Sequence, residues 1–280
     1  MSLPKNIHRL SGRRMPSTLT GTSGHVYILS KLLKPHPRNP EMNIYLAHGQ
    51  LRTHVDVNEN DRTLIYEYFS HNLLAFVQRN QKNLSLKVRK SILWELGLAV
   101  GKMHAKEWIH LDIKPDNIVM VDCHKTDQGH IKVEKAALSD FDCSLHLEGE
   151  KLLNAGIGNV MWRSPEAHIG KGIGKPSDVF SYGLLCLYVI TGVETLRLDF
   201  DELQEAGIEP EMEIMSRLIT LFGPVDPELV AHINEEQWGP ILTELSEATT
   251  RGDPNMRFDR WTEHVFPNLN AETKRVISTM

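Results

Sequence analysis

The 280-residue sequence is poor in cysteine and contains no long hydrophobic run. Its three cysteines, Cys123, Cys143 and Cys186, form no CxxC pair. So sparse and odd a set excludes a disulfide framework and favours a reducing compartment. The most apolar stretch, residues 183–190, is too short to cross a bilayer and instead predicts a buried helix. We therefore expect no membrane partner and a cytoplasmic or nuclear location.

An excess of positive charge is also missing. The formal net charge is −5 at pH 7, which gives no indication of a broad nucleic-acid-binding surface. The hydrophobic content of 41% and charged content of 24% are typical of globular proteins. The length is sufficient for one large domain or for two lobes. We expect a monomer with no nucleic-acid partner.

Acidic residues are absent from residues 1–40, although this segment carries seven lysines and arginines and many serines and threonines. The composition predicts a basic arm that is partly disordered, or the degenerate beginning of a small lobe. A mitochondrial transit peptide has the same acid-poor, arginine- and serine-rich character and stays open as an alternative. The lack of a clear amphipathic helix argues against it.

Chemically versatile side chains gather in residues 109–120. Asp112, Lys114 and Asn117 lie within one short loop that apolar residues flank on both sides. A carboxylate can accept a proton from an attacking hydroxyl, and a lysine beside it can neutralise a phosphoryl group in transfer. An amide oxygen can bind a divalent metal. The loop therefore predicts phosphoryl-transfer chemistry.

This loop resembles the catalytic loop of the eukaryotic protein kinases in its Asp-x-Lys-Pro-x-Asn form, which implies a serine/threonine kinase. Three more motifs follow in the order of that family. Residues 138–142 (Leu-Ser-Asp-Phe-Asp) resemble the metal-binding Asp-Phe-Gly, residues 162–166 (Trp-Arg-Ser-Pro-Glu) resemble the Ala-Pro-Glu, and residues 178–183 resemble the start of the central buried helix. Arg163 before Ser-Pro-Glu resembles the CMGC group. Four ordered motifs argue against a local coincidence.

The resemblance implies an α+β, two-lobed protein-kinase-like fold, with a small, partly degenerate β-rich N-lobe and a larger, mainly helical C-lobe. Residues 1–40 would form the arm, residues 41–69 the remnant N-lobe strands and hinge, and residues 70–280 a C-lobe truncated at its end. Hydrophobic periodicity and turn residues predict the elements. They are strands at 51–57 and 63–68, helices at 72–79 and from Ser85 to 103, a hairpin at 117–140, a helix ending before Gly223, and a helix at 238–246.

The same resemblance implies roles for the catalytic residues. Asp112 would be the base that orients the substrate hydroxyl, and Lys114 would stabilise the transferring phosphoryl group. Asn117 and Asp140 would bind Mg²⁺, and ATP would be the phosphoryl donor. The substrate would be a protein. His110 would pack beneath the phenylalanine of the metal motif.

The resemblance also implies a nucleotide-binding set. The backbone of residues 67–69, with Glu67 and Phe69, would bond adenine as the hinge, and Val119 would lie under the ring. Lys31 or Lys34 would hold the α- and β-phosphates. No GxGxxG or Val-Ala-x-Lys is present, so the phosphate-clamping end of the resemblance is poor.

Three residues depart from the family pattern. Leu111 replaces the arginine that receives an activating phosphate, and residues 143–157 contain only one hydroxyl, that of Ser144. We therefore predict no phosphorylation switch in this segment. Asp142 replaces glycine in the metal motif. Asn159 stands where a threonine would bridge the base and the lysine, and its amide is expected to make that bond.

Two other functions fit parts of the sequence. A pseudokinase, acting as a scaffold, would explain the missing phosphate clamp, because without it the nucleotide is poorly positioned. A small-molecule phosphotransferase of the aminoglycoside/choline kinase type would explain the Asp-Phe-Asp motif. Lys114 and the Ser-Pro-Glu segment argue against the second alternative.

Overall fold

The computed structural model describes residues 18–20, 22, 26–28, 43–44, 55–60, 63–66, 68–69, 71–121, 124–125, 131–233, 238–250 and 253–280. The chain divides into two compact units, residues 1–68 and 69–280. Within the described ranges, no helix has the length and apolar character needed to span a bilayer.

The first unit contains short strands. β1 (Thr18–Thr20) pairs with β2 (Val26–Ile28), while β4 (Asp56–Asn58) and β3 (Asn43–Ile44) flank β5 (Thr63–Ile65). β4 and β5 are antiparallel, with Val57 opposite Leu64. The two strands overlap the predicted strands at 51–57 and 63–68, although β5 ends three residues earlier than predicted.

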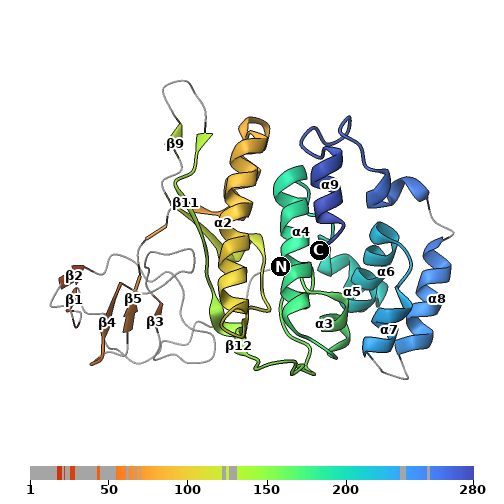
Figure 1. Ribbon diagram of the computed structural model, residues 1–280, viewed down its shortest axis with the longest axis horizontal. Helices are drawn as coiled ribbons and strands as arrows, with labels where there is room; N and C mark the ends of the chain where they lie inside the picture. Colours follow the sequence, from red (N-terminus) through yellow and green to blue (C-terminus); the bar gives the residue numbers. More distant parts are fainter. Residues whose placement is uncertain are drawn as a thin grey trace. The chain divides into compact units, whose positions relative to one another are not determined.

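Two long helices form the centre of the second unit. α2 (Leu86–His104) begins after Ser85, whose Oγ accepts the Val88 N–H at 3.4 Å. The hydrophobic periodicity that predicts this helix corresponds to a buried stripe, which contains Ile92, Leu96, Ala99 and Met103. α4 (Lys175–Thr191) lies beside α2 (Figure 1) and buries every residue from 183 to 190, as the sequence predicts.

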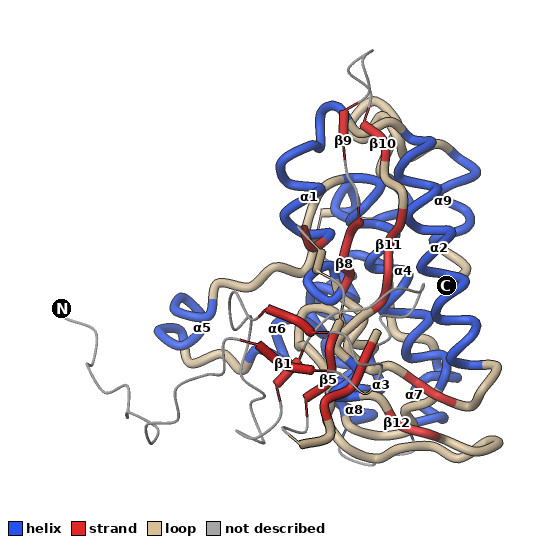
Figure 2. The backbone as a smooth tube through the Cα atoms, turned by 90° about the vertical axis from the view of Figure 1, so that its left-hand side faces the viewer, coloured by secondary structure: helices blue, strands red, loops and turns tan. Residues whose placement is uncertain are grey.

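A small sheet covers α2. β8 (Ile118–Val121) lies between β11 (Lys135–Leu138) and β6 (His71–Asn72), antiparallel to both. The hairpin continues into the short pair β9 (His124–Lys125) and β10 (Ile131–Lys132) (Figure 2). Ala136 and Ala137 of β11 are buried, and β11 packs on α2. The predicted hairpin between residues 117 and 140 is confirmed.

Smaller helices complete the second unit: α1 (Leu73–Asn80), α3 (Pro165–Ile169), α5 (Phe200–Ala206), α7 (Pro227–Ile233), α8 (Trp238–Thr250) and α9 (Ala271–Ile277). α6 (Pro210–Phe222) ends before Gly223, whose φ of +104° favours glycine. Phe222, the last residue of α6, is not buried in the core of the unit, since it is 40% exposed. Its ring packs instead against Phe180 and Phe258.

Candidate active site

Helix α4 holds the loop that carries Asp112 through hydrogen bonds to its main chain. The loop follows β7 (Trp108–Ile109) and leads into a 3-10 turn, η2 (Pro115–Asn117). Asp178, a fully buried residue of α4, accepts the main-chain N–H of His110 at 2.7 Å and that of Leu111 at 2.8 Å. These two bonds stabilise Leu111 at a φ of +64°, which is uncommon for a residue with a side chain.

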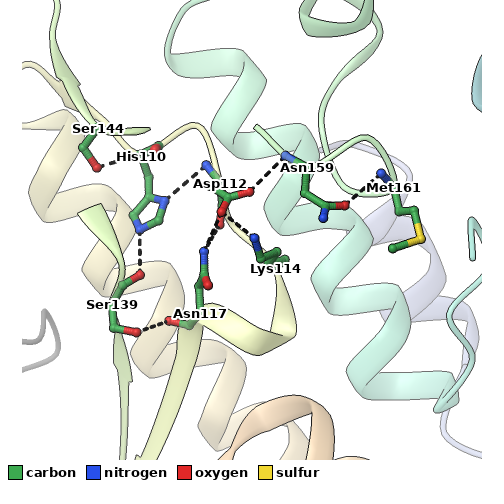
Figure 3. A network of polar contacts seen from close by, with 8 residues as sticks. All are labelled: His110, Asp112, Lys114, Asn117, Ser139, Ser144, Asn159 and Met161. Carbon is green, nitrogen blue, oxygen red and sulfur yellow. Dashed lines mark hydrogen bonds and ion pairs between the residues drawn. The ribbon is translucent and has the colours of Figure 1, made fainter. Parts of the chain in front are cut away.

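Asp112 lies at the centre of a network of donors (Figure 3). Its Oδ1 accepts the main-chain N–H of Asn159 at 3.0 Å. Its Oδ2 accepts Lys114 Nζ at 2.6 Å and Asn117 Nδ2 at 2.8 Å. The structure thus brings together the three residues that the sequence places in the catalytic loop. Charge-assisted bonds on both oxygens hold the carboxylate in one orientation.

His110 has the structural position that the resemblance implies. Its ring lies 5.3 Å from that of Phe141, centroid to centroid. Nδ1 accepts the Asp112 N–H at 3.3 Å, so Nε2 carries the proton and donates to the Ser139 carbonyl at 3.1 Å. Burial lowers the pKa of His110, which favours this neutral form. The imidazole therefore ties the catalytic loop to the strand that leads to Asp140.

Asn117 and Asp140 lie at the same end of the β8–β11 hairpin, where Ile118 pairs with Leu138. Ser139 donates both its N–H and its Oγ–H to the Asn117 carbonyl, at 2.9 and 2.8 Å. Asp140 has a φ of +66° at the start of a 3-10 turn, η3 (Phe141–Cys143), yet its carboxylate does not cap that turn. Asn117 donates from its Nδ2 to Asp112, so Oδ1 is the side-chain polar atom that remains for another ligand.

These two side chains fit a hard divalent cation. An amide oxygen and a carboxylate are the donors that Mg²⁺ prefers, and Mg²⁺ needs only one or two protein ligands when phosphates supply the rest. Asp142, which replaces glycine, has no positive φ and is exposed within η3. The carboxylate at 142 therefore needs none of glycine's conformational freedom.

The expected side-chain bridge from Asn159 is wrong. Its main-chain N–H, not its amide, contacts Asp112, while its Oδ1 accepts the Met161 N–H at 3.0 Å. Any residue other than proline offers a main-chain N–H at 159, whereas a side-chain bridge would need a particular residue type.

The nucleotide-binding residues are only partly described. Glu67 and Lys31, together with Lys34, lie outside the described residues. Phe69 is buried. Val119 is half-buried in β8, opposite Ala137 on one side and Asn72 on the other.

Two residues, Asp178 and Gly158, have structural roles at the site that the sequence did not predict. Asp178 belongs to a recognised motif, but its part in holding the loop is visible only in the fold. Gly158 has a φ of +90°, and a Cβ there would overlap the Leu111 carbonyl oxygen. The close approach places the next N–H, that of Asn159, on Asp112. The signal in the sequence that could have indicated this role is the glycine directly before Asn159.

Residues 42–259 match the protein kinase domain model. The chain belongs to the protein kinase family. Its described second unit supplies the helical lobe of that fold, and the four motifs all lie within the matched range.

The similar proteins include kinases of three kinds. Cyclin-dependent kinase-like 4 of Mus musculus is 31% identical over 150 residues, 52% of this chain and 41% of that protein. The DYRK-family kinase pom1 of Schizosaccharomyces pombe is 31% identical over 187 residues, 66% of this chain and 15% of that protein. Serine/threonine-protein kinase ULK3 of Xenopus laevis is 27% identical over 217 residues, 75% of this chain and 41% of that protein.

The fold has a neighbour among solved structures, a chain of the yeast RNA polymerase II CTD kinase CTDK-1 complex. The TM-score is 0.59 at 13% identity, covering 76% of this chain and 62% of that one. These findings confirm the predicted CMGC-like kinship and the α+β kinase fold. The chain spans about two fifths of the length of the cyclin-dependent kinase-like relative.

Proposed function

We propose that this chain transfers the γ-phosphate of ATP to serine or threonine hydroxyls of a protein substrate. The observation that carries the proposal is the geometry of Asp112, whose two oxygens are oriented by three donors from two segments of the fold. Phosphoryl transfer asks little covalent chemistry of a protein and depends on alignment and charge stabilisation.

Asp112 is the residue that receives the hydroxyl proton. Its oriented carboxylate can accept a hydrogen bond from an incoming hydroxyl and direct the lone pair of that oxygen toward the phosphorus. Lys114, 2.6 Å from Asp112 Oδ2, remains close enough to neutralise negative charge that develops on the transferred group.

Asn117 and Asp140 are the residues that would hold Mg²⁺. When bound, the ion would bridge the phosphates and withdraw charge from them. The contribution of the chain is to fix both ligands on one rigid hairpin end, through the Ser139 bonds to the Asn117 carbonyl. A site supported in this way loses little by reorganisation.

A transfer assay tests the proposal. Purified chain, ATP and Mg²⁺ should label a generic basic protein on serine or threonine. Asp112→Asn should lower kcat/KM by roughly 10²–10⁴-fold, the usual contribution of a positioned general base. Asp116→Asn, an exposed neighbour in the same loop, is the matched control and should retain wild-type activity.

Labelling that survives Asp112→Asn would contradict the proposal. A wild-type chain that transfers no phosphate but binds nucleotide would instead support the scaffold function.

A further inference from the structure

An apolar cluster joins the catalytic loop to the segment that follows the metal motif. Ile109, Leu111, Ala167 and Ile173 are buried together, and four side chains pack on them: Cys143, Leu147, Leu153 and Ile157. The four partly buried members all come from residues 143–157. Leu111, the residue immediately before Asp112, is one of the buried members and is 5% exposed; we call these eight residues the Leu111 cluster.

Main-chain hydrogen bonds also hold residues 143–157 in place. β12 (Leu145–His146) pairs with β7, and the Leu147 N–H donates to the Glu107 carbonyl at 2.8 Å. Leu153 and Ile173 exchange two main-chain bonds, at 2.9 and 3.0 Å. The segment is therefore attached at two places, to β7 just before the loop and to Ile173 just before α4.

The far end of the segment delivers the contact that matters for chemistry. Ile157 belongs to the Leu111 cluster, Gly158 lies against the Leu111 carbonyl, and Asn159 donates its N–H to Asp112. A change in how the segment packs on Leu111 would therefore move a donor that orients Asp112.

No hydroxyl on the segment offers the same connection. Ser144 is the only hydroxyl among residues 143–157. Its Oγ is half-buried and donates toward the His110 carbonyl at 3.5 Å, so it already faces the loop. A phosphate there would have to leave this position and expose its charge to solvent.

We infer that Leu111 is a positioning residue: its side chain packs the 143–157 segment onto the catalytic loop and so holds the Asn159 N–H on Asp112, without any modification of the segment. The inference rests on the proposed function for its kinetic consequence, and on the packing alone for its structural one. Burial of apolar side chains needs no covalent modification, so the unmodified chain already holds the segment in this arrangement.

The test compares Leu111→Ala, Leu111→Met and Leu152→Ala in the full chain. Met preserves volume and avoids the β-branching that a positive φ disfavours. Leu152 lies in the same segment outside the cluster and is 49% exposed, which makes it the control. Two quantities are measured: hydrogen exchange of the amides in residues 143–157, and kcat and KM for ATP in transfer to a generic basic protein.

We expect Leu111→Ala to speed exchange in the segment at least tenfold and to lower kcat about tenfold or more, with KM for ATP changed less than about twofold. Leu111→Met should restore both, and Leu152→Ala should match the wild type. Phosphatase treatment of the wild type should leave kcat unchanged. If circular dichroism shows that Leu111→Ala is unfolded, Leu147→Ala, on the segment side of the cluster, takes its place.

Unchanged exchange in Leu111→Ala, fast exchange with unchanged kcat, no rescue by Leu111→Met, or loss of activity on dephosphorylation would each overturn the inference. The exchange measurement needs no catalysis. A wild-type chain that transfers no phosphate would therefore refute the proposed function, while exchange would still decide whether Leu111 holds the segment.

Discussion

At the scale of single residues, Asp112 depends on a main-chain group that only a glycine can bring close. Gly158 has a φ of +90°, and its missing side chain leaves room for the Leu111 carbonyl oxygen. The following N–H then reaches Asp112 Oδ1 at 3.0 Å. The identity of residue 159 matters less for this contact than the glycine before it.

Gly158→Ala should therefore reduce phosphoryl transfer. A methyl group would overlap the Leu111 carbonyl and strain the backbone by about 1–3 kcal/mol, so the chain would shift and the Asn159 N–H would leave Asp112. We expect kcat to fall at least tenfold, since small displacements of an aligned group are costly. Steady-state kinetics on the purified variant measures the change.

Gly156→Ala provides the matched control. Gly156 lies two residues earlier, and a Cβ there would meet nothing within 4 Å. This variant should keep wild-type kcat. Equal activity in the two variants would show that the close approach at Gly158 is not needed.

Residue types and the family resemblance were sufficient to propose roles for Asp112, Lys114, Asn117 and Asp140. They could not predict which atom of Asn159 contacts the base, because a main-chain N–H carries no sequence signature. The role of Asp178 was equally hidden, since its partners are the main-chain N–H groups of residues about 70 positions away along the chain.

At the scale of elements, a buried arginine joins the two central helices. Arg89 of α2 is 1% exposed. It donates Nε to the Leu84 carbonyl at 2.9 Å, Nη2 to the Gln81 carbonyl at 2.6 Å, and Nη1 to the carbonyl of Val189 in α4. Burial lowers the pKa of Arg89, but three carbonyl acceptors compensate its charge.

Arg89→Met should destabilise the second unit. The variant fills similar volume but leaves the carbonyls of Gln81, Leu84 and Val189 without their donor. We expect the free energy of unfolding to drop by about 3 kcal/mol, measured by urea denaturation.

Lys87→Met, an exposed lysine two residues earlier in α2, is the control and should change stability by less than about 0.5 kcal/mol. If Arg89→Met were as stable as Lys87→Met, the arginine would not join the helices in the way described.

Element prediction from the sequence succeeded where periodicity and caps agreed. Ser85 and the stripe after it define α2, and Gly223 ends α6 as predicted. The 40% exposure of Phe222 could not be predicted, because its partners, Phe180 and Phe258, come from other elements. Helical periodicity reports one face of one helix and cannot report a neighbour that is remote in the chain.

At the scale of the whole molecule, a buried histidine makes stability depend on pH. His168 in α3 is 6% exposed, and its Nδ1 accepts a bond from Arg163 Nε at 3.2 Å. Burial, and then the charge of Arg163, lower the pKa of His168 to about 3. Arg163 also forms an ion pair with Glu211 at 2.6 Å.

Acidification from pH 7 to pH 5 should weaken the wild type more than His168→Asn. Below about pH 6.5 the unfolded chain binds a proton at residue 168, whereas the folded chain does so only near pH 3. Stability contributed by neutral His168 is therefore present above this window and is lost as the pH falls through it. At pH 5 the loss is about 2 kcal/mol.

Urea unfolding at the two pH values measures the difference between the chains. Asn can keep an acceptor for Arg163 but cannot titrate in this range. Because His110 and the other titratable groups are common to both, they cancel in the comparison. An equal loss of stability in the two chains would contradict the assignment to His168.

The most direct test of the account asks whether the hairpin end at Asn117 and Asp140 binds magnesium-nucleotide. The measurement is the thermal unfolding midpoint of wild type, Asp140→Ala and Asp116→Asn, with ATP plus Mg²⁺ and with ATP plus EDTA. At a nucleotide concentration near 100 Kd, binding should raise the Tm of the wild type and Asp116→Asn by roughly 5–10 °C with Mg²⁺ and little without it. Asp140→Ala should show no rise. No Mg²⁺-dependent rise in the wild type, or an equal rise in Asp140→Ala, would contradict the account.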